Sequence, residues 1–228
     1  MQTRAIVAEL VGTALLLSAV VGSGIMGERL ANGNAAIALL ANSLATGAAL
    51  SALILTFGPI SGAHFNPAVS VTDAVHGGLR WNTAAFYVGA QVVGAFVGVA
   101  IADVMFGESA FAWSTHARTG LPQMLSEAVA TFGLLSVILG CARSRPDAVP
   151  FAVGAYIAAA YWFTSSTSFA NPAVTLARAA TNTFSGIQPS DVPGFLLAQA
   201  VGASAATGLF RWLVPSNAAT RPDWRNAS

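Results

Sequence analysis

The motif Asn66-Pro67-Ala68-Val69 recurs in the second half of the chain as Asn171-Pro172-Ala173-Val174. Asparagine is a favoured helix N-cap, and proline suits the first helical position, where no backbone N–H is needed. Each motif therefore predicts the start of a helix. The residues before each motif, 58–65 and 164–170, follow apolar runs and predict irregular backbone. One copy alone would indicate an ordinary helix start, but two copies in matching positions indicate a duplication.

The composition indicates a membrane protein. The chain has 228 residues, of which 55% are hydrophobic and only 8% are charged. Soluble domains carry about 25% charged residues. A membrane-spanning helix needs about 20 mostly apolar residues. Six segments fit this description, at about residues 5–26, 35–57, 82–106, 124–141, 149–163 and 193–213.

Other residues repeat with the motif. Glu9 opens the first apolar segment and Glu127 opens the fourth, while Gln91 and Gln199 occupy matching places in the third and sixth. Three spans per half is an odd number, so the second half must be inverted relative to the first. The sequence predicts a single channel domain, residues 1–228, with inverted repeats at about 1–115 and 121–214.

Two short segments remain, at about residues 67–77 and 172–183. Each would form about 15 Å of helix, half the thickness of a bilayer. Because of the inversion they enter from opposite faces, so Asn66 and Asn171 meet near the midplane with the positive helix ends converging. Irregular backbone at that depth must be buried in protein or line a water-filled cavity. We therefore predict an all-α membrane protein with six transmembrane helices and two re-entrant half-helices around a pore.

The charges predict the orientation. All ten basic residues are arginines, and seven of them lie on the side of the predicted bundle that carries both termini. The positive-inside rule places that side in the cytoplasm. We expect a cell (inner) membrane protein whose first span is retained and whose polar segment 215–228 is cytoplasmic. The net charge of +1 gives no reason to expect nucleic-acid binding.

With these motifs, the chain from Glu9 to about residue 213 resembles the aquaporin family of major intrinsic proteins. The resemblance implies a homotetramer in membrane lipid, in which each protomer has its own pore for water and small neutral solutes, with no cofactor or metal. It implies that Asn66 and Asn171 donate N–H groups to the permeating molecule. It also implies that Glu9 and Glu127 hold the loops before the half-helices. We expect His64 to support the first loop by bonding its backbone rather than to act as a gate.

The chain departs from the family at the second constriction, where members place an arginine directly after the second Asn-Pro-Ala. Here that residue is Val174. Counting by offset from the two motifs gives Thr46, Ala159 and Ser168 as the other three filter positions. This set is small and uncharged, although Tyr161 and its neighbours restore bulk if the count is off. We expect a broad filter that passes glycerol-like polyols or neutral metalloid hydroxides such as arsenite.

Arg178 lies one helical turn beyond Val174 on the same face. Our first expectation is a helix-end arginine paired with a loop carboxylate or carbonyl. The alternative is that Arg178 moves the positive charge of the filter to the outer vestibule.

Two other functions compete with a passive channel. Secondary transporters also use inverted repeats and broken helices, and they would need a coupling-ion site, for which Glu9 and Glu127 are the buried candidates. A membrane enzyme is disfavoured, since the sequence shows no metal-ligand cluster, nucleophile–base pair or phosphate-binding glycine loop.

Overall fold

The computed structural model describes residues 2–214, and these residues form only helices and loops. The predicted all-α fold is confirmed. The segment 215–228, predicted as a cytoplasmic tail, lies outside the described residues. The helices are α1 (Gln2–Leu30), α2 (Ala35–Ser61), α3 (Pro67–Val75), α4 (Trp81–Met105), α5 (Leu121–Ser144), α6 (Val149–Phe163), α7 (Pro172–Arg178) and α8 (Val192–Leu213), with short 3₁₀ turns η1 (Pro146–Ala148) and η2 (Pro189–Asp191).

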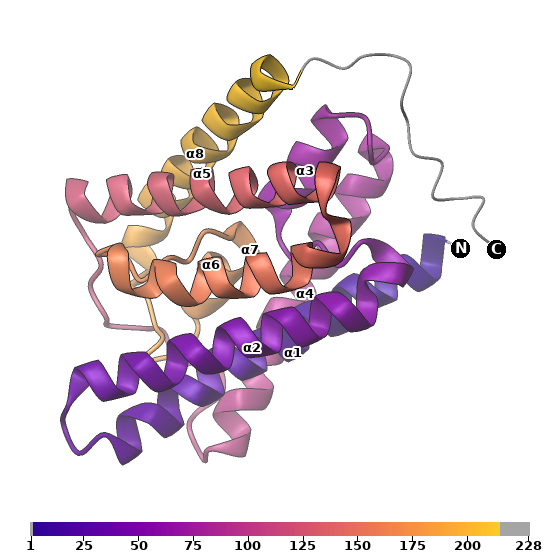
Figure 1. Cartoon of the computed structure of the whole chain (residues 1–228). Helices are drawn as coiled ribbons and strands as arrows, with labels where there is room; N and C mark the ends of the chain where they lie inside the picture. Colours follow the sequence, from indigo (N-terminus) through magenta and orange to yellow (C-terminus); the bar gives the residue numbers. More distant parts are fainter. Residues whose placement is uncertain (1, 215–228) are drawn as a thin grey trace.

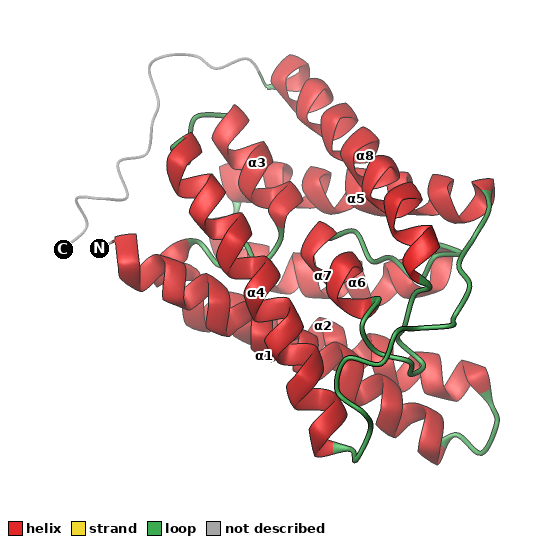
Figure 2. Ribbon diagram, turned by 180° about the vertical axis from the view of Figure 1, so that it is seen from behind, coloured by secondary structure: helices red, strands yellow, loops and turns green. Residues whose placement is uncertain are grey.

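The two halves repeat the same order of elements: two long helices, one short helix and a third long helix (Figure 1). In the first half α1 packs against α2 and α4, and in the second half α5 packs against α6 and α8. The halves meet where α2 packs against α6. The short helices α3 and α7 contact each other, and Figure 2 shows both of them among the long helices from behind.

The long helices are suited to a bilayer. In the described part of the chain, α1, α2, α4, α5 and the η2–α8 segment are long and apolar enough to cross a membrane. Helix α6 has 15 residues, about 22 Å, and η1 directly precedes it. Large apolar side chains face outward, among them Leu44, Phe86 and Leu197. This is the surface expected of a multi-pass membrane protein, because its solvent is hydrocarbon.

Two predicted boundaries were wrong. Helix α2 continues through Pro59 to Ser61, so the irregular backbone begins only at Gly62, whose φ of 89° gives a left-handed C-cap. Glycine adopts this φ without strain because it has no Cβ. A residue in the left-handed conformation at this position ends the helix. Helix α7 ends at Arg178 rather than near residue 183. The segment after it is a hydrogen-bonded loop, in which the Ile187 N–H donates to the Arg178 carbonyl at 3.2 Å.

Equivalent glycines allow close helix contacts in both halves. A Cβ added to Gly94 on α4 would lie 2.3 Å from the Leu10 carbonyl oxygen of α1. A Cβ added to Gly202 on α8 would lie 2.2 Å from the Ala128 carbonyl oxygen of α5. Both carbonyls belong to the residue directly after the repeated glutamate. Close backbone approach at these crossings therefore fixes where each glutamate sits, as small residues do between membrane helices.

We expect Gly202→Ala to destabilise the fold by about 1–3 kcal/mol, because α5 and α8 must separate to admit the methyl group. Gly208→Ala is the matched control in the same helix, since a Cβ there meets nothing within 4 Å. Thermal unfolding in detergent, followed by intrinsic fluorescence, would show a lower midpoint for Gly202→Ala only. Equal midpoints for the two variants would contradict the close-contact interpretation.

Candidate functional site

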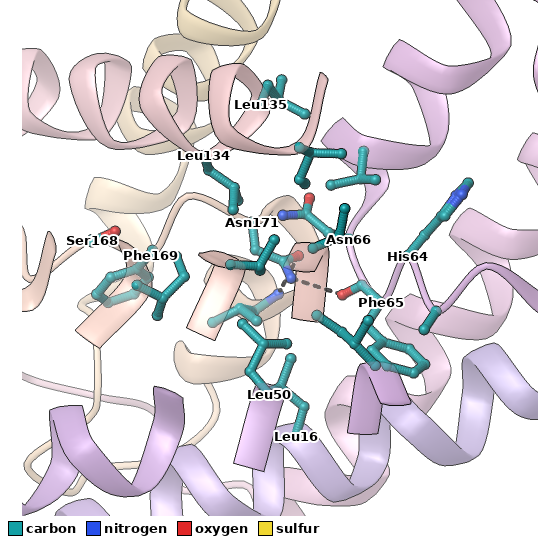
Figure 3. A pocket seen from close by; sticks show the side chains of 18 of the residues that line it. Leu16, Leu50, His64, Phe65, Asn66, Leu134, Leu135, Ser168, Phe169 and Asn171 are labelled. Carbon is teal, nitrogen blue, oxygen red and sulfur yellow. Dashed lines mark hydrogen bonds between the residues drawn. The ribbon is translucent and has the colours of Figure 1, made fainter. Parts of the chain in front are cut away.

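A cavity of about 300 Å³ lies between the two halves. Its lining comes from α1, α2, α3, α5, α6 and α7 and from the loops before α3 and α7. Figure 3 shows Asn66 and Asn171 in the middle, with His64 on one side and Ser168 and Phe169 on the other. Most of the wall is apolar: Leu16, Val20, Leu50, Ile54, Val69, Leu134, Leu135, Ile138, Leu139, Val149, Val153, Ile157 and Val174.

The two asparagines cap the half-helices and bind across to each other's loop. The Asn66 Oδ1 accepts from the Ala68 N–H at 2.9 Å, and the Asn171 Oδ1 accepts from the Ala173 N–H at 3.0 Å. The Asn66 Nδ2 donates to the Ala170 carbonyl and the Asn171 Nδ2 donates to the Phe65 carbonyl, both at 2.8 Å. Figure 3 shows the second of these two bonds. A carboxamide nitrogen carries two hydrogens. These two hydrogen bonds between the halves are here called cross-links. Each asparagine therefore has a second amide N–H that its cross-link does not use, beside the cavity that the asparagine lines.

The loops before the half-helices have left-handed backbone at matching residues. The φ angles are 49° at Ala63 and 48° at Phe65 in the first loop, and 51° at Ser168 and 48° at Ala170 in the second. Residues other than glycine adopt this region at a cost of about 1–3 kcal/mol each. The surrounding structure must supply hydrogen bonds that outweigh this cost.

Each buried glutamate supplies these hydrogen bonds to the loop of its own half. The Glu9 carboxylate accepts from the N–H groups of His64 at 3.0 Å and Phe65 at 2.7 Å. The Glu127 carboxylate accepts from the N–H groups of Phe169 at 2.8 Å and Ala170 at 2.9 Å. Both glutamates are fully buried.

A glutamine from the third long helix of each half completes the arrangement. The Gln91 Nε2 donates to Glu9 at 2.8 Å and to the Ser70 hydroxyl at 2.9 Å. The Gln199 Nε2 donates to Glu127 at 2.7 Å and to the Thr175 hydroxyl at 2.8 Å. The carboxylate, the loop and the half-helix are thus joined in one network in each half.

One end of the cavity, here called the His64 end, is formed by His64 and Asp73 with the nearby ends of α5 and α6. The His64 Nδ1 lies 3.0 Å from the Ser70 hydroxyl, and its Nε2 lies 3.7 Å from the Asp73 carboxylate. The imidazole therefore contacts side chains of α3. The prediction that it bonds the loop backbone was wrong for the ring, although the His64 backbone N–H does bind Glu9.

The other end, the Arg178 end, contains Thr46, Tyr161, Ser168 and Arg178. The Thr46 hydroxyl and the Tyr161 hydroxyl lie 3.3 Å apart across the gap between α2 and α6. Thr46 is about 22 Å along α2 from the residue that ends that helix, which places it far from the His64 end. Thr46, Ser168 and Val174, three of the four predicted filter residues, line the cavity.

Ala159, the fourth predicted filter residue, does not line the cavity. It is exposed on the outer face of α6, and Tyr161 takes its place. The lining residues of α6 are spaced by four, at Val149, Val153, Ile157 and Tyr161. This spacing keeps side chains on one helical face, and a residue two before Tyr161 points to the opposite face. The prediction of Ala159 is therefore wrong, and a tyrosine lines the cavity at this level of α6 instead.

Arg178 is held in the wall by the loop and by an aromatic ring. Its side chain is only 2% exposed, and its Nε donates to the Ser185 carbonyl. Its guanidinium carbon lies 3.5 Å from the centre of the Phe169 ring, a cation–π geometry. The expected pairing with a loop carbonyl is thus present, and the residue also lines the cavity. The loop itself is anchored where the Thr181 hydroxyl donates to the buried Asp103 carboxylate at 2.8 Å.

The comparisons with known proteins agree with this geometry. The family model described as major intrinsic protein matches residues 1–164. Aquaglyceroporin AqpS of Rhizobium meliloti (strain 1021) is 56% identical over 212 residues, which cover 93% of this chain and 91% of that protein. Aquaporin TIP2-1 of Zea mays is 34% identical over 75% of this chain and 72% of its own length. The chain belongs to the major intrinsic protein family.

A solved structure has the same fold. The X-ray structure of the aquaglyceroporin from Plasmodium falciparum superposes with a TM-score of 0.74 over 92% of this chain and 96% of that one, at 22% sequence identity. Within residues 2–214, the architecture is therefore six transmembrane helices and two half-helices in an inverted repeat. As a major intrinsic protein it is a channel for water and small neutral solutes, and it is not an enzyme.

The sequence did not single out several residues that this major intrinsic protein brings to the site. Phe169 forms the aromatic surface under Arg178, and Asp73 lines the His64 end. Arg118, from the loop before α5, also lies over Phe169 at 5.1 Å and donates to the Gly186 carbonyl at 2.8 Å. Asp73 could have been predicted to line the cavity, because it lies seven residues after Asn66 and therefore on the same helical face. The contacts of Arg118 depend on how a long loop folds, and no sequence pattern predicts them.

We expect Glu127→Ala to destabilise the channel far more than Glu127→Gln. Alanine leaves the Phe169 and Ala170 N–H groups without an acceptor, at about 1–3 kcal/mol per buried donor, whereas glutamine keeps one acceptor oxygen. Thermal unfolding in detergent and water permeability of proteoliposomes would measure the two effects. An alanine variant as stable and as permeable as the wild type would contradict the role of Glu127 in holding the loop.

Proposed function

We propose that the channel passes small neutral solutes wider than water, such as glycerol-like polyols and neutral metalloid hydroxides, through a filter formed by Thr46, Tyr161, Ser168 and Val174. The observation that carries this proposal is that Val174 lines the cavity one turn before Arg178. No guanidinium projects from position 174, where the family places one. The name of the bacterial relative at 56% identity, an aquaglyceroporin, supports the same reading.

The mechanism that we propose uses a polar track through an apolar bore. Asn66 and Asn171 act as central donors, each through the amide N–H that is not used in the hydrogen bond to the other half. The hydroxyls of Thr46 and Tyr161 offer further hydrogen bonds at the Arg178 end. The remaining wall, rich in Leu, Ile and Val, gives a solute few other partners. A polyol or metalloid hydroxide exchanges its hydration for this track.

The structure also bears on the transporter alternative. Glu9 and Glu127 are the buried carboxylates that ion coupling would require. Both are engaged by loop N–H groups and by a glutamine, with no exposed surface, so neither is open to a coupling ion. A passive channel predicts solute flux proportional to the solute gradient and independent of a proton or sodium gradient.

We further propose a homotetramer in the lipid of the cell inner membrane, with both termini cytoplasmic. Five of the arginines on the terminal side of the bundle, Arg4, Arg80, Arg143, Arg145 and Arg211, fall within the described residues and are exposed. This charge distribution favours a cytoplasmic location for that side. The outward apolar faces offer surface both to lipid and to neighbouring protomers.

We expect Val174→Arg to reduce glycerol permeability about tenfold or more while reducing water permeability much less. A bulky cation would then project into the bore beside Thr46, and a tenfold change corresponds to about 1.4 kcal/mol of barrier. Stopped-flow light scattering on proteoliposomes, normalised to protein amount, measures both permeabilities on the same vesicles. Val174→Leu is the control that adds bulk without charge. Equal reduction of both permeabilities, or none, would refute the broad filter.

We expect Tyr161→Ala to raise the glycerol-to-water permeability ratio, because the tyrosine occupies the lumen opposite Thr46. Ala159→Phe is the matched control on the same helix, since position 159 faces outward. That control should leave both permeabilities unchanged. If Ala159→Phe blocks glycerol and Tyr161→Ala has no effect, the assignment of Tyr161 to the filter is wrong.

A further inference from the structure

The two half-helices carry opposite charges at equivalent positions. Asp73 lies seven residues after Asn66, and Arg178 lies seven residues after Asn171. Seven residues are close to two turns of helix, so each charge lies on the same helical face as its asparagine. Val69 and Val174, three residues after each asparagine, share that face. All of these side chains line the cavity.

The charges therefore lie at opposite ends of one bore. The half-helices begin at the central asparagines, whose cross-links join the two loops, and α3 and α7 lead away from that point. Asp73 is near the end of α3 and Arg178 is the last residue of α7. The path from end to end thus passes a carboxylate, the two asparagines and a guanidinium.

Neither charge is cancelled by a strong ion pair. Among residues 2–214, the basic group within 4 Å of the Asp73 carboxylate is the His64 imidazole, at 3.7 Å, and the Asp73 side chain remains 39% exposed. Within the same residues, no carboxylate lies within 4 Å of the Arg178 guanidinium, which is bound by a carbonyl and an aromatic ring. A buried charge of this kind is screened much less by salt than a surface charge.

The neighbouring charges leave this polarity in place. At the Arg178 end, Arg118 lies over the same Phe169 ring and adds charge of the same sign. At the His64 end, Glu9 is enclosed by its donors. Arg80, seven residues after Asp73, and Arg143, in the last turn of α5, are both exposed to solvent. The field of exposed charges is weakened by salt, whereas Asp73 lines the bore itself.

We propose that Asp73 and Arg178 are specificity-determining residues that form two opposite charge barriers, Arg178 against cations and Asp73 against anions. This inference rests on the proposed channel function and extends it to ions. A filter without an arginine at position 174 lacks the barrier that such an arginine would provide. The pair restores exclusion of both signs of charge, because any ion that traverses the bore must pass one residue of its own sign. Neutral solutes pass both residues without this cost.

The test compares solutes that are matched in shape and differ in charge. Urea and guanidinium form the cation pair, and dimethyl sulfone and methanesulfonate form the anion pair. Proteoliposomes of the wild type, Arg178→Gln, Asp73→Asn and the double variant are subjected to osmotic gradients of each solute. Arg178→Lys keeps the charge, and Arg143→Gln removes an exposed arginine outside the bore; both are controls. Water permeability and thermal unfolding verify that each variant is folded.

We expect Arg178→Gln to raise the guanidinium-to-urea permeability ratio about tenfold or more. A tenfold rise corresponds to a barrier to guanidinium that is lower by about 1.4 kcal/mol. We expect Asp73→Asn to raise the methanesulfonate-to-dimethyl sulfone ratio by a similar factor. Arg178→Lys retains the charge and should raise the guanidinium-to-urea ratio much less than Arg178→Gln, whereas Arg143→Gln should behave like the wild type. Asp73→Asn is nearly isosteric at a half-exposed site, so its result stands even if Arg178→Gln fails to fold.

Two outcomes are distinguishable failures. If wild-type vesicles pass neither urea nor dimethyl sulfone nor glycerol faster than protein-free vesicles, the proposed function itself is wrong. If these neutral solutes pass but folded Asp73→Asn or Arg178→Gln leaves its ion ratio unchanged, the charge-barrier proposal is overturned. The loss of hydration against apolar walls would then be what excludes ions.

Discussion

The two halves of the chain depend on each other through one reciprocal pair of hydrogen bonds. Asn66 donates to the Ala170 carbonyl, and Asn171 donates to the Phe65 carbonyl. Inside a bilayer no bulk water is available to satisfy these carbonyls, so the partner half must do so. Each asparagine also caps its own half-helix. Loss of one side chain therefore leaves orphan groups in both halves, and neither loop has its final geometry without the other.

This constraint explains why a carboxylate is kept inside the membrane. The loop residues before each asparagine have left-handed backbone, so their N–H groups cannot enter a helix or a strand. Glu9 and Glu127 accept those N–H groups from behind the loop, which leaves the other side of the loop to line the cavity. An ionised acceptor forms stronger hydrogen bonds than a neutral one. The cost of burying the charge is offset by three or four donors to each carboxylate.

The parts of the site that could be predicted are those fixed by local chemistry and by the repeat. The helix-start signal of Asn-Pro-Ala, together with the matching Glu and Gln positions, was sufficient to predict the fold, the half-helices and the central asparagines. Val174 and Ser168 were found in the lining because no gap separates them from the second motif. The prediction for α6 was wrong because it counted back from Asn171 across the loop before α7. That count gave Ala159, two residues from Tyr161, which lines the cavity. Prediction also failed for Arg118, whose position depends on how a long loop folds back over Phe169.

The position of Arg178 separates two properties that a filter arginine would combine. A guanidinium at position 174 would supply both positive charge and bulk in the bore, opposite Thr46 and Tyr161. One turn farther along α7, the guanidinium is drawn into the wall by the Ser185 carbonyl and stacked on Phe169. The charge is retained, but the space beside Val174 is left to a small apolar side chain. In the channel that we propose, the width of the filter is set at position 174 and its charge at position 178. Polar solutes larger than water can then be admitted without opening the same path to cations.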